Sequence, residues 1–236
     1  MSRIAFLFPG QGAQYIGMGR QIYDAFESAR RVFNLAGEAL GYDMADMVFN
    51  GDEEMLKITE NTQPAILTVS VACLQAVREK GLEAEAAAGL SLGEYTAHVA
   101  AGSLTFTDAV RLVRKRGKFM QEAVPLGVGG MAAILGLEDS AVIECCKEAS
   151  SSGIVEPANF NCPGQVVVAG EMAALEKTIE LAKARGAKRA MMLQVSAPFH
   201  CSLLKPAGQK LAFELEGVVI GAMRIPVVSN VTGDYI

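Results

Sequence analysis

A serine flanked by glycines is the residue of this sequence best suited to act as a nucleophile. Gly89-Leu90-Ser91-Leu92-Gly93 fits the pattern G-x-S-x-G, in which a strand turns sharply into a helix and exposes the serine hydroxyl. Glycines permit the close backbone approach that such a turn needs. The first amides of the helix then face the point where negative charge develops. The alternative is an ordinary glycine-rich turn, but the strand before it and the helix after it favour a nucleophile.

A serine hydroxyl needs a base, and the sequence contains only two histidines. His98 follows Ser91 on the expected helix, about 10 Å along its axis. It is therefore too far away for a hydrogen bond, and we interpret it as structural. His200, in a loop after a strand, remains the candidate base. Cys201 beside it is a rival nucleophile, but adjacent side chains point apart, which favours a plain thiol.

Arg116 lies on the inward face of the expected helix 107–124. It falls on a stripe that is otherwise apolar, beside the outer stripe that comprises Arg111, Lys115, Lys118 and Glu122. A buried guanidinium needs an anion or other acceptors, because its burial is otherwise costly. Two interpretations remain open: a clamp for a substrate carboxylate, or a structural arginine bound to main-chain carbonyl groups.

The loop Phe8-Pro9-Gly10-Gln11-Gly12 follows the first expected strand. A backbone amide of this loop, near Gln11, is a candidate second donor to an oxyanion, with the amide of Leu92 as the first. The glycines do not form a dinucleotide-binding motif, because Tyr15 stands where that motif needs glycine.

Alternating strand and helix patterns predict an α/β fold with a parallel sheet. Residues 1–127 and 197–236 form the expected large domain, with strands at 3–8, 84–88 and 225–231 and a helix at 63–80. Residues 128–196 form an inserted ferredoxin-like domain with the order β-α-β-β-α-β. Its expected elements are 130–136, 138–150, 154–160, 165–169, 171–185 and 188–195, and the chain returns to the large domain through Ser196-Ala197-Pro198.

Composition excludes several classes of protein. The net charge is −5 and tryptophan is absent, which argues against binding of nucleic acid. No apolar run reaches the ~18 residues that a membrane span requires. The five cysteines show no C-x-x-C spacing and indicate a reducing compartment, so we expect a soluble cytoplasmic protein. Two histidines exclude a metal site built from several of them.

Taken together, these motifs resemble the malonyl-CoA:acyl-carrier-protein transacylases, and most of them resemble the acyltransferase domains of polyketide synthases. The resemblance runs from residue 3 to about 231. The matching segments, in chain order, are Phe8–Gly12, Gln63-Pro64, Gly89–Glu94, Arg116-Gly117 with Met120-Gln121, Asn159–Gln165 and Phe199-His200.

The resemblance implies the catalytic roles. Ser91 would be the acylated nucleophile and His200 its base, while the backbone amides of Gln11 and Leu92 would form the oxyanion hole. The implied fold is a hydrolase-like parallel sheet with helices on both faces, carrying the ferredoxin-like subdomain.

The resemblance also implies how the substrate is held. Arg116 would bind the malonyl carboxylate, and Phe199 matches the variant that selects malonyl groups. Gln63 and Asn161 match motif positions near the cleft, without an assigned role.

The implied reaction is ping-pong transfer of a malonyl group from malonyl-CoA to the phosphopantetheine thiol of acyl carrier protein, for fatty-acid biosynthesis. It requires no metal and no permanently bound cofactor, and we expect a monomer. Two alternatives are a serine esterase or thioesterase, which would need Asp139 or Glu156 to orient the histidine, and a non-catalytic module that binds CoA or the carrier.

Two departures from the family pattern stand out. Leu90 replaces the usual histidine before the nucleophile, and we expect it to tune the stability of the acyl-enzyme. Family members are also roughly 70 residues longer, about half a domain. We therefore expect a fragment that lacks the carbonyl group that orients the histidine, together with a helix and a strand near the cleft.

Overall fold

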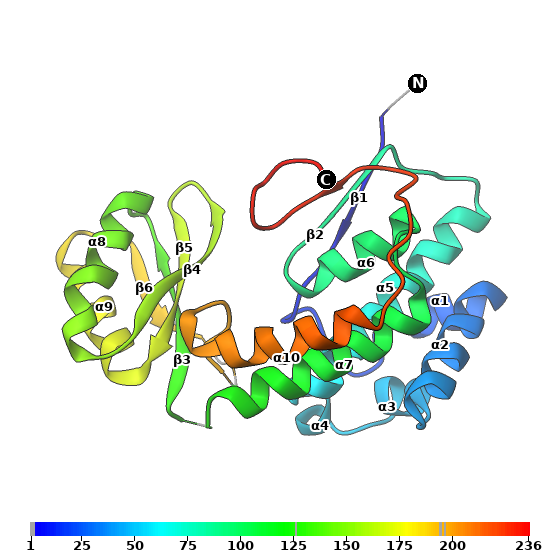
Figure 1. Cartoon of the computed structure of the whole chain (residues 1–236), viewed down its shortest axis with the longest axis horizontal. Helices are drawn as coiled ribbons and strands as arrows, with labels where there is room; N and C mark the ends of the chain where they lie inside the picture. The colour runs from blue at the N-terminus through cyan, green and yellow to red at the C-terminus, as the bar shows by residue number, and fades with distance from the viewer. Residues whose placement is uncertain (1–2, 126, 194, 196) are drawn as a thin grey trace. The chain divides into compact units, whose positions relative to one another are not determined.

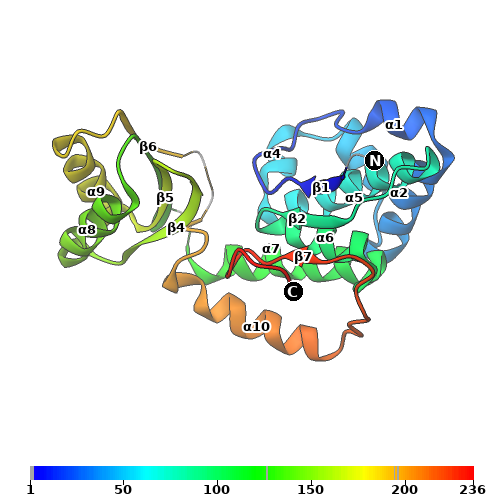
Figure 2. The ribbon, with the colours of Figure 1, turned by 90° about the horizontal axis from the view of Figure 1, so that it is seen from above.

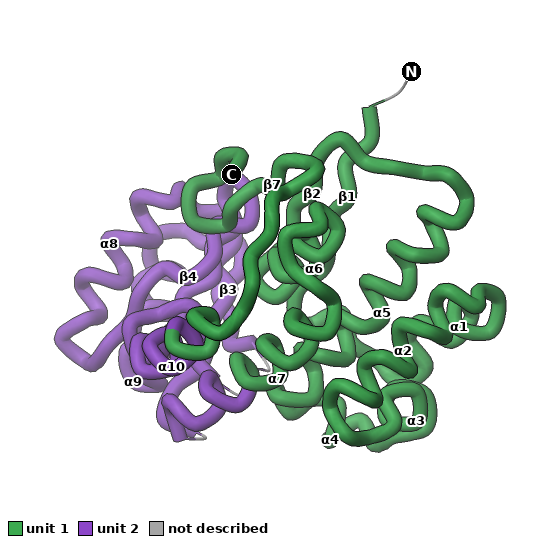
Figure 3. The backbone as a smooth tube through the Cα atoms, turned by 45° about the vertical axis from the view of Figure 1, so that its right-hand side comes forward, with its two compact units in different colours: residues 1–117, 213–236 green, residues 118–212 purple. Residues whose placement is uncertain are grey.

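The computed structural model describes residues 3–125, 127–193, 195 and 197–236. The chain divides into two compact units, coloured separately in Figure 3: a first unit of residues 1–117 and 213–236, and a second unit of residues 118–212. Both boundaries fall inside helices, within α7 (Phe106–Ala123) and α10 (Lys205–Glu216). The boundaries expected from the sequence are at 127/128 and 196/197, and Ser196 is outside the described residues.

A parallel sheet forms the centre of the first unit (Figure 1). Its strands, in spatial order among the described residues, are β1 (Ala5–Phe8), β2 (Ala86–Gly89) and β7 (Val227–Val228). Phe8 is in register with Gly89, and Ala88 with Val228. The carboxyl ends of the strands therefore meet at one edge of the sheet, where ligands of open parallel sheets bind.

The first unit also contains the helices of an α/β fold. They are α1 (Arg20–Ala25), α2 (Glu27–Leu40), α3 (Met44–Phe49), α4 (Glu53–Lys57), α5 (Thr59–Glu79), α6 (Leu92–Ala101) and α7. Helix α6 packs directly on the sheet, which confirms the α/β class. Helix α5 is buried over most of its circumference, so it carries apolar residues such as Leu67 and Val71 on several sides. Gln63 of the same helix has no exposed surface, and a buried amide of this kind requires hydrogen-bond partners.

Small residues bring α6 close to the sheet. Ala97 and Ala101 of α6 share a buried cluster with Ala87 of β2 and Val227 of β7. Because these side chains are short, the start of the helix lies near the end of β2. A turn of only two residues, Leu90 and Ser91, then suffices to connect them.

The second unit has the predicted ferredoxin-like order of elements. They are β3 (Gly129–Leu135), α8 (Asp139–Ala149), β4 (Val155–Cys162), β5 (Gln165–Glu171), α9 (Met172–Ala184) and β6 (Arg189–Met192). The strands pair antiparallel in the order β4-β5-β3-β6 within the described residues. Both helices lie on the same face of this sheet (Figure 2).

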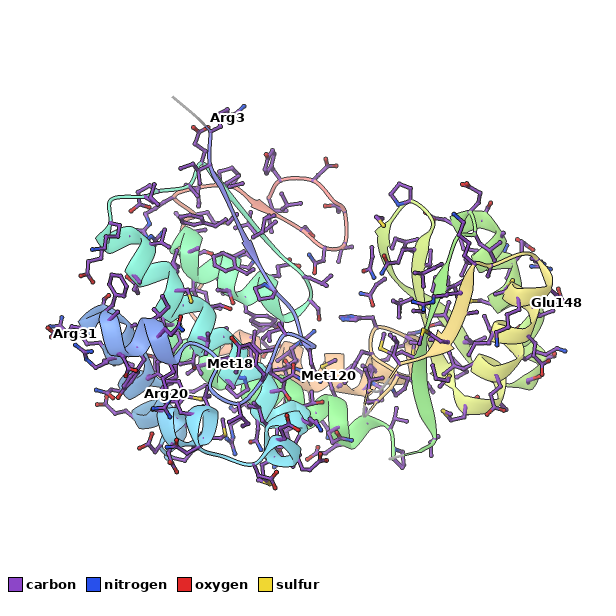
Figure 4. All side chains as sticks on the ribbon, turned by 180° about the vertical axis from the view of Figure 1, so that it is seen from behind. Arg3, Met18, Arg20, Arg31, Met120 and Glu148 are labelled. Atoms are coloured by element: carbon purple, nitrogen blue, oxygen red, sulfur yellow. The ribbon has the colours of Figure 1, made fainter. Side chains whose placement is uncertain are left out.

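Successive side chains of each strand point to opposite faces of this sheet, and both faces are buried. Ile134 and Val168 belong to the cluster beneath α8 and α9. Val167 and Met131 point to the opposite face, where a second cluster contains Met120, labelled in Figure 4. The segment after β6 joins this second cluster through alternate residues, and it is the segment that carries His200.

Most elements lie within a few residues of their predicted positions, with two differences. Helix α5 begins at Thr59, because the carbonyl group of Ile58 already accepts hydrogen bonds from the helix start, and Pro64 therefore lies inside the helix. The predicted strand 225–231 shrinks to β7, because Ser229 starts a turn instead of a ladder. Gln194, within the predicted strand 188–195, and Ser196, the first residue of the predicted return, lie outside the described residues.

The end of α6 explains the structural role of His98. The main-chain carbonyl group of His98 accepts a hydrogen bond from Gly102, which caps the helix with a φ of 82°. The imidazole Nδ1 of His98 lies 2.9 Å from Ser103 Oγ. Partial burial lowers the pKa of His98 below its usual 6.5, and Glu94 opposes this shift.

This lowered pKa predicts a pH dependence of stability. Below pH 6.5 the unfolded chain protonates His98 while the folded chain resists, so the free energy of unfolding should fall as the pH drops through that value. Urea unfolding at a series of pH values measures the effect, and His98→Asn should flatten the curve. The His200→Gln variant, which keeps His98, is the comparison. Equal pH dependence in His98→Asn and the wild type would contradict the assignment.

Candidate active site

Ser91 lies in the turn between β2 and α6 with a strained backbone. Its φ of 52° and ψ of −102° put a non-glycine residue in a region that costs about 1–3 kcal/mol. A Cβ on Gly89 would lie 2.0 Å from the carbonyl carbon of Gly93, and one on Gly93 would lie 2.3 Å from the carbonyl oxygen of Phe8. Both positions therefore require glycine, and the sharp strand–helix turn predicted by the motif is present.

Two backbone amides near this turn, those of Gln11 and Leu92, have no hydrogen-bond acceptor among the described residues. The loop after β1 lies against the turn, because a Cβ on Gly10 would be 2.7 Å from the carbonyl oxygen of Leu90. The side chain of Gln11 is held by its Nε2, which donates to Thr59 Oγ1 at 3.2 Å.

Arg116 reaches the nucleophile directly. Its Nη2 donates to Ser91 Oγ at 3.0 Å, and its Nη1 donates to Oε1 of the buried Gln63 at 2.8 Å. Both contacts go to neutral side chains rather than to main-chain carbonyl groups, which favours the carboxylate clamp over the purely structural alternative. The spacing of apolar residues on the helix thus predicted that Arg116 faces inward, and the fold places its guanidinium beside Ser91.

The surroundings of Arg116 make its charge costly. Burial lowers the pKa of Arg116, and nearby Tyr95 and Glu94 oppose the shift. The guanidinium also lies 5.7 Å from the centre of the Tyr95 ring. A Cβ on Gly117 would be 2.5 Å from the carbonyl oxygen of Thr59, so this glycine lets α7 approach α5 closely. An anionic ligand beside the guanidinium would gain strongly in such surroundings.

His200 belongs to the second unit and points outward from its core. Phe199 and Cys201 are buried in the cluster on the second face of the sheet, whereas His200 between them is exposed. His200 also has a left-handed backbone, with a φ of 63°. Ser91 and His200 are thus the non-glycine residues with positive φ in the described chain, and such strain clusters at functional sites.

Cys201 and Glu156, two further candidates from the sequence, make structural hydrogen bonds in the second unit. Cys201 Sγ donates to the carbonyl oxygen of Pro198 at 3.2 Å, and burial raises the pKa of the thiol. A buried thiol with a raised pKa is a poor nucleophile, which supports the plain-thiol interpretation. Glu156 Oε2 accepts a hydrogen bond from the amide of Ser202 at 2.6 Å, so this carboxylate ties β4 to the segment that carries His200.

The predicted site residues are distributed over both units. Five of them lie in the first unit: Ser91, Leu92, Gln11, Gln63 and Arg116. Arg116 connects Ser91 to Gln63 through its two hydrogen bonds. The second unit contains the remaining predicted residues, namely His200, Phe199 and Asn161. Asn161 is exposed near the end of β4, and Phe199 is adjacent to His200 in the chain.

Asn230 is a site residue that the sequence interpretation missed, because it was assigned to the strand 225–231. It lies in the turn after β7, and its Oδ1 accepts a hydrogen bond from the amide of Ser91 at 2.5 Å. Its Nδ2 donates to the carbonyl oxygen of Gly89 at 2.7 Å, and its amide donates to Glu94 Oε2 at 3.1 Å. The available signal was its position just after a strand that ends at the same sheet edge as β2.

The described residues show neither a metal-binding cluster nor a membrane-spanning helix. They contain no group of three or more histidine, cysteine, aspartate or glutamate side chains that is placed to hold a metal ion. No helix in the described chain has both the length and the apolar character needed to cross a membrane.

Comparison with known proteins agrees with this geometry. Residues 5–235 match the acyl transferase domain family. The malonyl CoA-acyl carrier protein transacylase of Bacillus subtilis is 50% identical over 235 residues, which cover 99% of this chain and 74% of the relative.

Two solved structures share the fold over the full chain. The acyl-carrier-protein S-malonyltransferase of Burkholderia pseudomallei aligns with a TM-score of 0.96 at 50% identity, over 100% of this chain and 76% of that one. A malonyl-transacylase in complex with a type II PKS acyl-carrier protein aligns with a TM-score of 0.97 at 48% identity, with the same coverage. Together with the strained serine and its arginine, these matches show that the chain belongs to the acyl transferase domain family and is an acyltransferase.

Proposed function

We propose that this acyltransferase moves a malonyl group from malonyl-CoA to the phosphopantetheine thiol of acyl carrier protein through a malonyl ester on Ser91. The observation that carries the proposal is the 3.0 Å contact between Arg116 Nη2 and Ser91 Oγ, which places a buried cation beside the nucleophile. Relatives at 50% identity are named for this reaction. A related malonyl-transacylase forms a complex with a type II PKS acyl-carrier protein.

The first half-reaction acylates the serine. His200 accepts the proton of Ser91 Oγ as the oxygen attacks the thioester carbonyl carbon of malonyl-CoA. The amides of Gln11 and Leu92 donate to the resulting oxyanion, a contribution that commonly reaches 10²–10³-fold in rate per donor. Collapse of the tetrahedral intermediate breaks the carbon–sulfur bond, and the protonated His200 returns its proton to the CoA thiolate.

The second half-reaction reverses these roles. The phosphopantetheine thiol gives its proton to His200 and attacks the malonyl ester. The same two amides stabilise the second oxyanion. Ser91 then leaves with the proton from His200, and the carrier holds the malonyl thioester. No step calls for a metal or a bound cofactor.

Arg116 supplies selectivity for a malonyl group in this proposal. Its fork of N–H groups matches the malonyl carboxylate, and Gln63 fixes the orientation of the fork by accepting from Nη1. The carboxylate would replace Ser91 Oγ as the partner of Nη2, which frees the hydroxyl for attack. We further propose that Phe199, which is buried and next to His200 in the chain, limits branching of the acyl group.

A basic patch should dock an acidic carrier, and Arg114, Lys115 and Lys118 on α7 are the candidates, but each already lies beside a carboxylate. Arg114 lies 3.7 Å from Glu60, Lys115 pairs with Glu214, and the Nζ of Lys118 lies 3.9 Å from the carboxylate of Glu122. These side chains are therefore less available to an acidic partner than their positive charge suggests.

The remaining proposals concern the cell compartment and the oligomeric state of the enzyme. The five cysteines are all free, which fits a reducing compartment, and we place the chain in the cytoplasm as a monomer.

The acyl-enzyme can be tested by intact mass measurement. Incubation with malonyl-CoA should increase the mass by one malonyl group, and Ser91→Ala should abolish the increase because it removes the attacking oxygen. Cys201→Ala should still be labelled. Labelling of Ser91→Ala would contradict the proposal, steady release of CoA without a carrier would indicate a hydrolase, and CoA binding without an adduct would indicate a non-catalytic module.

Arg116→Ala should change substrate selectivity. We expect the kcat/KM for malonyl-CoA to fall about 10–100-fold, since a charge-assisted hydrogen-bond pair is lost, while acetyl-CoA should be accepted at least as well as before. Steady-state transfer to a carrier thiol measures both values. The control is Arg111→Ala, which removes an exposed cation from the same helix. An equal loss with both acyl groups would rule out the clamp.

A further inference from the structure

The turn after β7 connects to every part of the strained elbow. Asn230 binds the carbonyl oxygen of Gly89 at the end of β2, the amide of Ser91, and the carboxylate of Glu94 in the first turn of α6. One side chain and its own amide therefore join the strand, the nucleophile and the helix, which are the three parts that the elbow must hold in place.

The hydrogen bond to the Ser91 amide stabilises the positive φ of that residue. A positive φ at a serine persists only where the surroundings impose it. Asn230 Oδ1 gives the Ser91 amide an acceptor at 2.5 Å in that conformation, whereas the next amide, that of Leu92, is left without an acceptor among the described residues. The asparagine thus satisfies one amide and keeps the elbow in the shape that leaves the other open.

Asn230 is itself held firmly. The turn that carries it is closed by the amide of Ser229, which donates to the carbonyl oxygen of Asp234 at 3.0 Å, and by the amide of Gly233, which donates to that of Ser229 at 2.9 Å. The amide of Val231 donates to Ser229 Oγ at 3.2 Å. Because these hydrogen bonds already order the turn, holding the Asn230 side chain in place loses little further conformational entropy.

We propose that Asn230 is the positioning residue of the nucleophile: it holds Ser91 in the positive-φ conformation that aims Oγ at the thioester and the Leu92 amide at the oxyanion. The inference rests on the proposed function, since it needs Ser91 to be the acylated residue. Asn230 makes no bond to substrate and acts only through the backbone of the elbow.

The experiment compares Asn230→Ala with the wild type and with Asn50→Ala. Asn50 is a matched control, because its amide group also donates once and accepts once, to Asp46 and from Arg20, away from the elbow. The rate of malonyl-Ser91 formation is measured in single turnover over a range of malonyl-CoA concentrations. Amide hydrogen exchange at Ser91 is measured on the same proteins. Asn230→Asp, which keeps the acceptor and loses the donor to Gly89, is a milder second variant should the alanine variant not fold.

Asn230→Ala should lower the maximal acylation rate by on the order of 100-fold, with the half-saturating concentration of malonyl-CoA little changed. Exchange of the Ser91 amide should become faster. In Asn230→Asp the maximal acylation rate should fall about tenfold, and in Asn50→Ala it should equal the wild-type rate. An unchanged maximal rate in Asn230→Ala, or in Asn230→Asp if only that variant folds, overturns the inference, as does an equal loss in Asn50→Ala. Absence of an adduct on the wild type would instead overturn the proposed function.

Discussion

The positive φ at Ser91 is the constraint on which the first unit depends. A serine adopts this conformation only when the strand before it and the helix after it are forced together. Close approach in turn requires that neither chain carries bulk at the contact, which explains Gly89 and Gly93 in the motif and the alanines of β2 and α6. The composition of the sheet centre therefore follows from the geometry of one residue.

The buried cation imposes a second demand of the same kind. Burial removes water from Arg116 and lowers its pKa, so its guanidinium needs hydrogen-bond acceptors in the protein. Gln63 serves this purpose from α5, and Gly117 allows the two helices to approach closely enough for the contact. A polar residue without exposed surface on α5 is thus explained by the charge that it supports, not by the packing of its own helix.

The parts of the site that could be predicted from the sequence are those that a short stretch of residues determines. The elbow could be predicted because five consecutive residues encode it, and Arg116 because its position on a helix stripe is a matter of periodicity. Asn230 could not, since its role depends on β7 pairing beside β2, a contact between residues far apart in the chain. Strand propensity through residue 231 also hid the turn at Ser229. Likewise, the helix predicted at 63–80 begins at Thr59, because its first hydrogen bonds go to the carbonyl group of Ile58.

Leu90 shows that the turn does not depend on the side chain directly before Ser91. Its amide donates to the carbonyl oxygen of Phe8 at 3.1 Å, and its carbonyl oxygen accepts from the amide of Gly93 at 2.8 Å. The position is fixed by the main chain alone, while its side chain is 52% exposed. A histidine at this position, as in the family pattern, would make the same backbone contacts. The residue before Ser91 can therefore vary without disturbing the turn, because its side chain is exposed and its backbone contacts do not depend on residue type.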